Sequence, residues 1–474
     1  MQVNAEYDKY KEDYQDLSDF FAGERQVKKQ ETRYTPMLEG QKGKDAAVYE
    51  RYVGFGILFN ALFRTRQGLK GAILRKPAEV VYPESKKTVL ADIMINGASF
   101  DDLIRESCDN VLGYGRYGAL IDIDDTDQKP FVAPYTASSI LDWPINKSKK
   151  VKQEILLQES ISVDDPANPG QTKVIEQRRL LELDGEGKYL VTIYRKVDIA
   201  GKDGDDWAVV ADMPGEPNPR MPKYKGKRLD FIPFVFFGSS SNVPQASRPP
   251  LLDLLNLSKG HWKLTVAYQY GLHFAGLPTP WFAGFDIEEG SKMPLGPGAA
   301  YHTTEPTATC GFLQTGGEGL ATMEKGLDRI EKQMAVTGSR MLEESRPGVE
   351  AAETVKLRSS GDSATLADIA GNNEAALTDV LQYIGFWEGV SPDQCSVGLN
   401  KDFVSAKLSP EYITALVAAI QAGEMSEVTF LWNLQQGEMM QPGRSIEEEQ
   451  EAIGEDKIKR QKEILKFGEQ GGEE

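Results

Sequence analysis

Residues 363–387, SATLADIAGNNEAALTDVLQYIGFW, carry the strongest secondary-structure signal in the chain. Six apolar side chains and one asparagine recur there at steps of three and four: Leu366, Ile369, Asn373, Leu377, Val380, Ile384 and Trp387. An α-helix completes a turn in 3.6 residues, so this spacing puts all seven on one face. The stretch predicts a long helix with one face buried against the rest of the fold.

Two more helices are predicted upstream of this one, over residues 250–275 and 320–344. The segment between them is punctuated by Pro and Gly, and it predicts short strands at 281–285, 299–303 and 311–314. Arg346, Pro347 and Gly348 then break the helical pattern before the long helix begins. The order is helix, small β excursion, helix, break and long helix.

The N-terminal half predicts helices followed by strands. An apolar stripe from Tyr7 to Phe21 predicts one helix, residues 46–74 predict a second that ends before Pro77, and Ser99 is a plausible N-cap of a third that reaches Leu112. From residue 119 the hydrophobic period changes to two. Candidate strands are 119–123, 150–159, 178–183, 189–196, 207–212 and 231–237, which indicates an antiparallel meander.

The C-terminal part predicts short, well-punctuated helices. Pro410 after Ser409 begins one that Gly423 ends, and Ser426 begins another that Gly437 ends. The tail is charged, with Glu455 and Lys459, and Asp456 and Arg460, spaced for i,i+4 pairs. Helices and antiparallel strands in separate stretches indicate the α+β class.

The net charge is −18, from 54 Lys and Arg against 72 Asp and Glu. Tight non-specific DNA binding requires many cations against phosphate, so this balance excludes a protein that holds DNA with its whole surface. It allows a conduit in which an acidic wall repels phosphate and only local basic features touch it. The polar N-terminus and short apolar runs predict a soluble chain without a secretory leader.

Three cysteines and three histidines, all widely spaced, form no disulfide framework and no zinc motif, so we expect no metal and no cofactor. Gly113, Gly115 and Gly118 spell GxGxxG, yet here a helix precedes the glycines and a strand follows, the reverse of a dinucleotide-binding loop. We interpret them as a helix-to-strand turn. The acids Asp122, Asp124, Asp125 and Asp127 suggest a cation site less than the polar side of a hairpin.

Catalytic signatures are missing from the sequence. It contains no nucleophile elbow, no phosphate-binding Walker loop and no catalytic cysteine pattern. The chain is therefore expected not to be an enzyme, and any motor that moved DNA would be another protein.

The predicted helix 320–344 has three kinds of side chain in separate sectors. Met323, Leu327, Ile330, Met334 and Met341 share one side, Lys325, Arg329, Lys332 and Arg340 lie roughly opposite, and Glu324, Asp328 and Glu331 form an intermediate flank. One interpretation is an ordinary solvated surface helix. The other is a helix beside copies of itself in a ring, where the acidic flank of one copy meets the basic flank of the next.

This order of parts resembles the tailed-bacteriophage portal protein, in a subgroup long catalogued only as a domain of unknown function, over nearly the whole chain. The motifs that carry the resemblance are Tyr7, Gly23-Glu24, Val27-Lys28, Tyr34-Thr35-Pro36, residues 49–60, Arg64-Thr65, Gly68-Leu69, Gly71, Arg75-Lys76-Pro77, residues 112–122, Val132-Ala133-Pro134-Tyr135, Ile140-Leu141-Asp142-Trp143, Phe231-Ile232-Pro233-Phe234, Gly423-Glu424-Met425-Ser426, residues 434–437 and Glu447-Glu448-Glu449. Each motif is short, and their order is what makes the resemblance specific.

The resemblance implies a portal fold. It assigns residues 1–249 to an α/β wing, 250–275 and 320–344 to two stem helices, 276–319 to a small β-containing clip, 345–362 to a tunnel loop, 363–408 to a long wing helix and its return, and 409–474 to a helical crown.

The resemblance also implies a function. A ring of usually twelve subunits would stand at one capsid vertex of the virion, assembled in the host cytoplasm, and pass double-stranded DNA during packaging and ejection. Expected partners are the terminase large subunit, a head–tail adaptor and the major capsid protein, with no membrane. Candidate DNA contacts in the lumen are Lys325, Arg329, Lys332, Arg340, Arg346, Lys356 and Arg358, each of which could instead form an intersubunit salt bridge.

Two alternatives remain at this point. One is another structural phage head or adaptor protein with a different symmetric assembly. The other is a nucleotide-binding enzyme that uses the glycine turn at 113–118 with the acids of 122–127.

Overall fold

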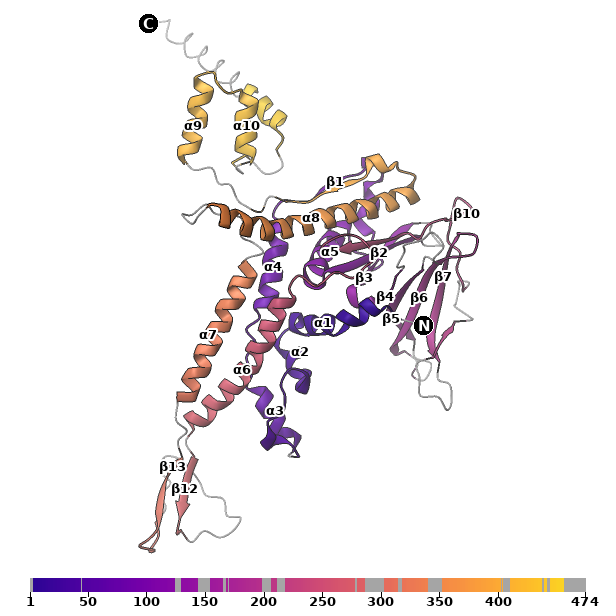
Figure 1. Ribbon diagram of the computed structural model, residues 1–474. Helices are drawn as coiled ribbons and strands as arrows, with labels where there is room; N and C mark the ends of the chain where they lie inside the picture. The colour runs from indigo at the N-terminus through magenta and orange to yellow at the C-terminus, as the bar shows by residue number, and fades with distance from the viewer. Residues whose placement is uncertain are drawn as a thin grey trace, which may run out of the picture. The chain divides into compact units, whose positions relative to one another are not determined.

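The computed structural model describes residues 3–43, 45–123, 129–143, 154–164, 168, 170–197, 206–210, 218–277, 279–285, 302–313, 318–339, 352–401, 403, 410–436, 439–440 and 444–455. The chain forms two compact units, Met1–Lys401 and Asp402–Glu474. Helices and antiparallel sheets occur together in the first unit (Figure 1), which confirms the α+β class. Among the described residues, no helix combines the length and apolar character needed to cross a bilayer.

Five helices build the N-terminal part of the first unit: α1 (Ala5–Ala22), α2 (Glu24–Lys29), α3 (Ala46–Gly54), α4 (Ala61–Ile73) and α5 (Phe100–Tyr114). The predicted cap of α5 is confirmed, because the Ser99 hydroxyl accepts from the Asp102 amide and the Asp102 carboxylate reaches back to the Ser99 amide. Short 3-10 turns lie between these elements: Glu31–Arg33, Glu39–Gln41, Glu84–Asp92, Ala137–Ser139 and Pro392–Gln394.

The prediction of one helix over residues 46–74 was wrong. The helix stops at Gly54 and α4 begins after Asn60, whose side chain accepts from the Phe63 amide as an N-cap. The break is held by packing, because a Cβ placed on Gly56 would be 2.3 Å from the Trp262 ring. Local periodicity could not indicate this contact with a distant helix.

The strands form two larger sheets in the first unit. The order β11–β2–β3 joins Phe234–Gly238, Arg116–Ile123 and Pro130–Thr136. The second sheet is the predicted antiparallel meander in chain order, and its strands are β4 (Ile140–Asp142), β5 (Glu154–Asp164), β6 (Thr172–Leu183), β7 (Tyr189–Val197) and β8 (Asp206–Val209). Smaller pairs are β1 (Glu79–Val81) with β14 (Ser396–Gly398), and β9 (Lys223–Tyr224) with β10 (Lys227–Arg228).

Two details of the strand prediction differ from the structure. Strands β3 and β4 were not among the candidate strands, since Pro130 and Pro134 weaken the strand signal there. The strand expected at 231–237 begins only at Phe234, because Pro233 has no amide hydrogen to give to a sheet. Residues 150–153 and 211–212 lie outside the described residues.

A helical hairpin follows the sheets. Helix α6 (Leu252–Gly276) and helix α7 (Glu318–Ser339) pack side by side, and the two-stranded hairpin of β12 (Thr279–Ala283) and β13 (Thr309–Leu313) extends from their far end (Figure 1). Of the strand expected at 299–303, residues 302–303 are not in a strand and 299–301 lie outside the described residues. We call α6 and α7 the stem pair.

The long helix α8 spans Ala352–Glu388. All seven residues of its predicted stripe are buried, and the helix packs on β11, β2 and α5. It begins earlier than expected, so residues 352–362 of the predicted tunnel loop are helical. The physical reason is that no Pro or Gly stands between Gly348 and Gly361 to stop the helix.

The second unit contains α9 (Pro410–Gln421) and α10 (Glu427–Gln436), and residues 446–455 are also helical. As predicted, Gly423 adopts a left-handed φ of 76° after α9, and the Ser426 hydroxyl accepts from the Thr429 amide at the start of α10. Gly437 and the charges Asp456, Lys459 and Arg460 lie outside the described residues.

Candidate functional site

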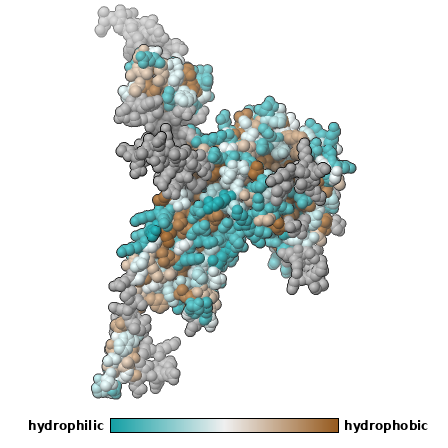
Figure 2. Space-filling view, viewed as in Figure 1, coloured by the Kyte–Doolittle hydropathy of each residue, from teal (hydrophilic) through white to brown (hydrophobic). Residues whose placement is uncertain are grey.

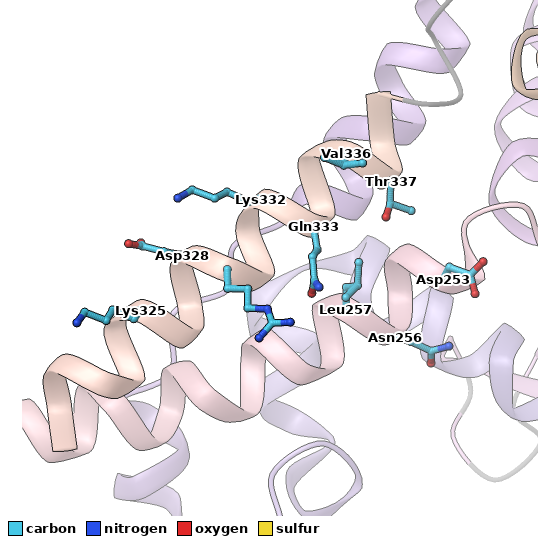
Figure 3. Close-up of a pocket in the computed structure, with 10 residues that line it drawn as sticks. Asp253, Asn256, Leu257, Lys325, Asp328, Lys332, Gln333, Val336 and Thr337 are labelled. Atoms are coloured by element: carbon cyan, nitrogen blue, oxygen red, sulfur yellow. The ribbon is translucent and has the colours of Figure 1, made fainter. Parts of the chain in front are cut away.

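An open groove of about 990 Å³ runs along the stem pair (Figure 3). Its lining residues come from both helices: Asp253, Asn256 and Leu257 from α6, and Lys325, Asp328, Arg329, Lys332, Gln333, Val336 and Thr337 from α7. Three of the seven predicted DNA-contact residues are therefore brought together in one place.

The stem pair is anchored firmly to the rest of the first unit. Trp262 on α6 is fully buried, and its indole N–H donates to the Thr35 hydroxyl at 2.9 Å. Lys259 forms a short ion pair with the buried Asp16 on α1. These contacts fix α6 along the side that faces away from the groove, so the groove walls rest on a rigid support.

A buried histidine joins the two stem helices. His261 is 4% exposed, and its Nε2 lies 3.0 Å from the Glu331 carboxylate on α7. Its Nδ1 lies 3.2 Å from the Thr265 hydroxyl, one turn along α6. Glu331 is thus taken from the acidic flank of α7 for a contact inside the stem pair.

The predicted apolar side of α7 is confirmed at Leu327 and Met334, which are buried, while Met323 and Ile330 are partly buried. The basic residues opposite, Lys325, Arg329 and Lys332, are exposed. Within the part of the chain that the structure describes, none of these three cations has an ion-pair partner. Figure 3 shows Lys325 and Lys332 pointing away from α6.

Unpaired acids accompany these cations. Glu324 and Asp328 on α7 are exposed and, among the described residues, have no cationic partner. Asp253 on α6 differs, because it pairs with Arg248 at 2.6 Å. In the space-filling view, hydrophilic side chains gather along the stem pair (Figure 2). The exposed face of α7 therefore carries free charges of both signs.

The other candidate DNA contacts are not brought to this groove by the described part of the structure. Arg340 and Arg346 lie outside the described residues, as does Met341. Lys356 and Arg358 belong to α8, but their side chains lie outside the description. On α6, Asp253 and Asn256 were missed by the sequence reasoning, although their i,i+3 spacing on the polar side of that helix was a signal for them.

The structure assigns the glycine-rich turn a backbone role. Gly115 ends α5 in the left-handed region with φ of 75°, and its amide donates to the Val111 carbonyl. The glycines thus close a helix and do not open one, which confirms the helix-to-strand turn. The basis of the nucleotide-binding alternative is therefore wrong.

Asp122 faces the protein interior. It forms a buried two-bond ion pair with Arg220, at 2.7 and 3.2 Å. Asp124, Asp125 and Asp127 lie outside the described residues. Among the residues that can be described, no cluster of three His, Cys, Asp or Glu is arranged to hold a metal ion.

Comparison with known proteins gives one family match. A family model described as "Domain of unknown function (DUF4055)" matches residues 250–388. That stretch begins just before α6 and ends at the last residue of α8, so it contains the groove and the β12–β13 hairpin. No curated protein sequence matches the chain.

Three solved structures resemble the chain at low identity. The chain titled "Virion of native gene transfer agent (GTA) particle" has a TM-score of 0.38 and 12% identity, covering 82% of this chain and 92% of that one. A chain from "Neck of empty GTA particle computed with C6 symmetry" has a TM-score of 0.37 and 11% identity, with 78% and 88% covered. A chain from "Neck of native GTA particle computed with C12 symmetry" has a TM-score of 0.37 and 14% identity, with 81% and 90% covered.

Proposed function

We propose that this chain is the portal subunit of a tailed phage or phage-like particle, a ring-forming conduit for double-stranded DNA at one vertex of the capsid. The observation that carries the proposal is the stem pair. An antiparallel pair of helices leaves free charges of both signs along one face, and it bears at its end a hairpin of two strands.

Free charges of both signs favour assembly with copies of the same chain. A cation on one copy can meet an acid on the next, and a head-to-tail contact of this kind closes into a ring when the rotation fits. A two-stranded hairpin is marginally stable alone, and exposed Trp281 and Phe312 on β12 and β13 are costly in water. Both features support neighbours around the stem.

The chain order supports the same proposal. A helical and β-rich wing, a stem helix, a hairpin clip, a second stem helix, a long helix and a helical C-terminal unit follow each other as the resemblance to portal proteins requires. The clip would face the terminase during packaging and the head–tail adaptor later. The wing and crown would meet the capsid side.

The charge distribution suits a conduit that does not hold its cargo. With a net charge of −18, most of the surface repels phosphate, and the stem cations provide the local contact. We assign no chemistry to the chain, since translocation would be driven by the terminase. Residues 345–351, together with the start of α8, would narrow the channel.

Another structural head or adaptor protein remains the second candidate, because free charges on a helix face suit other symmetric assemblies as well. The two candidates differ in what happens to DNA. A portal is required for the genome to enter the capsid, whereas an adaptor is required only after filling.

A packaging experiment tests the proposal. In cells that produce the particle, the gene for this chain is deleted and supplied from a plasmid as wild type or as the Arg346→Gln, Arg358→Gln double variant. Without the chain, heads should contain no DNA; with the double variant, rings should persist while packaged DNA falls. DNA-filled heads in the deletion strain would show that the chain is not the portal.

A further inference from the structure

The sides of α7 differ in chemistry around the helix axis. Taking the buried Leu327 as the reference direction and about 100° per residue, Glu324 and Asp328 lie at about 60–100°. Lys332 and Lys325 follow at about 140–160°, Arg329 at about 200° and Gln333 at about 240°. The order around the exposed face is therefore acids, lysines, arginine and groove.

Contacts with neighbouring elements fix what lies on each flank. Beyond the acids, Glu331 bonds His261, and a Cβ on Gly338 would lie 2.8 Å from the Thr65 hydroxyl of α4. On the other flank, Gln333 points toward α6 in Figure 3 and lines the groove with Asn256 and Leu257. The acids and the groove thus lie on opposite lateral sides of the stem pair.

We propose that the groove is the seat for the α7 helix of an adjacent copy, with Arg329 meeting Glu324 and Asp328 of that copy, while Lys325 and Lys332 remain free for DNA phosphate. This inference rests on the proposed ring. It divides the basic residues, which the sequence alone left equivalent, into one interface cation and two lumen cations.

Charge complementarity is the reason to place a second copy in the groove. The arginine on one lateral side has no ion-pair partner among the described residues, and the two acids on the other side have no cation there. A guanidinium group bonds carboxylates at two points and so fixes the register of two helices, which a lysine does less well. The lysines lie between the two lateral sides, where a ring of such contacts has its axis.

The decisive experiment is a charge swap in the full chain, followed by mass photometry across a range of concentrations. Arg329→Glu should raise the concentration for half-assembly at least about tenfold through like-charge repulsion. The Glu324→Lys, Asp328→Lys variant should do the same. Combining all three substitutions should restore assembly, because the charges are then complementary again. The Lys325→Gln, Lys332→Gln variant is the control and should assemble like the wild type.

The outcomes separate this inference from the proposed function. If the wild type forms rings and Arg329→Glu forms them equally well, or if the triple variant is not rescued, the groove assignment is wrong and the portal proposal stands. A wild type that never forms rings overturns both. Circular dichroism of each variant shows that a loss of assembly is not a loss of folding, and the rescue serves as a second control.

Discussion

Arg220 closes over Asp122 inside the first unit, with its Nη1 2.7 Å from the carboxylate Oδ2 and its Nη2 2.8 Å from the Ile123 carbonyl. Asp122 belongs to β2 of the three-stranded sheet, while Arg220 exchanges backbone hydrogen bonds with Val191 of β7 in the meander. This buried pair therefore ties the two sheets of the wing together, and the same acid is withdrawn from any role in cation binding.

Breaking this pair should be costly. Asp122→Asn leaves a buried guanidinium without its charge partner, and we expect the free energy of unfolding to fall by about 3–5 kcal/mol. Replacing the exposed Asp253, the partner of Arg248, by Asn should cost less than about 1 kcal/mol. Guanidinium unfolding of the full chain measures both. Equal losses for the two variants would contradict the structural role of the buried pair.

The contact between Gly56 and Trp262 gives a second prediction. A methyl group at residue 56 would overlap the indole ring, so Gly56→Ala should lower stability by about 1–3 kcal/mol by forcing α6 away from the helices beneath it. Gly54→Ala is the matched control, since its Cβ meets nothing within 4 Å and alanine favours the end of α3. Thermal unfolding distinguishes the two. A stable Gly56→Ala variant would mean that the break between α3 and α4 has another cause.

Acid sensitivity should come in part from Asp16. Burial opposes its ionisation, yet hydrogen bonds from Lys259, Arg33 and Tyr34 hold the pKa of Asp16 below its ordinary value of 3.8. A depressed pKa contributes stability that is present above the unfolded-state pKa and lost as the pH falls through the folded-state value. The stability difference between wild type and Asp16→Asn should therefore be largest near neutral pH and shrink below about pH 4. A difference that stays constant down to pH 2 would contradict this.

The lumen lysines should affect DNA and not assembly. Lys325→Gln with Lys332→Gln should leave rings intact but weaken their binding to double-stranded DNA, with a salt dependence reduced by about 0.9 per lost phosphate contact. Lys87→Gln, which removes an exposed wing cation that pairs with Glu84, is the matched control and should change neither property. Unchanged DNA affinity in the double variant would remove the two lysines from the channel.

Periodicity and capping predicted the parts of the fold that are specified locally. The stripe of α8, the Ser99 cap and the Gly423 turn depend on residues within one or two turns, and all three are confirmed. The break after α3 and the pairing of Asp122 with Arg220 depend on residues far away in the sequence, which no local pattern contains.

The candidate site was predicted only in outline. The three sectors of α7 followed from helical spacing, but the roles of its charges required knowledge of its neighbours. His261 removes Glu331 from the acidic flank, and Asn256 and Leu257 of α6 supply the opposite wall of the groove. These contacts distinguish Arg329 from the two lysines.

The central claim is that copies of this chain stand around an axis with their stem pairs as the wall of a channel. Electron microscopy of the purified full chain, with a map that resolves helices, tests it most directly. The expected result is a closed ring with an open centre, with α7 of every copy toward the axis and its acidic side against the groove of the next copy. Single copies at every concentration, or an assembly whose stem pairs point outward from the axis, would contradict the claim.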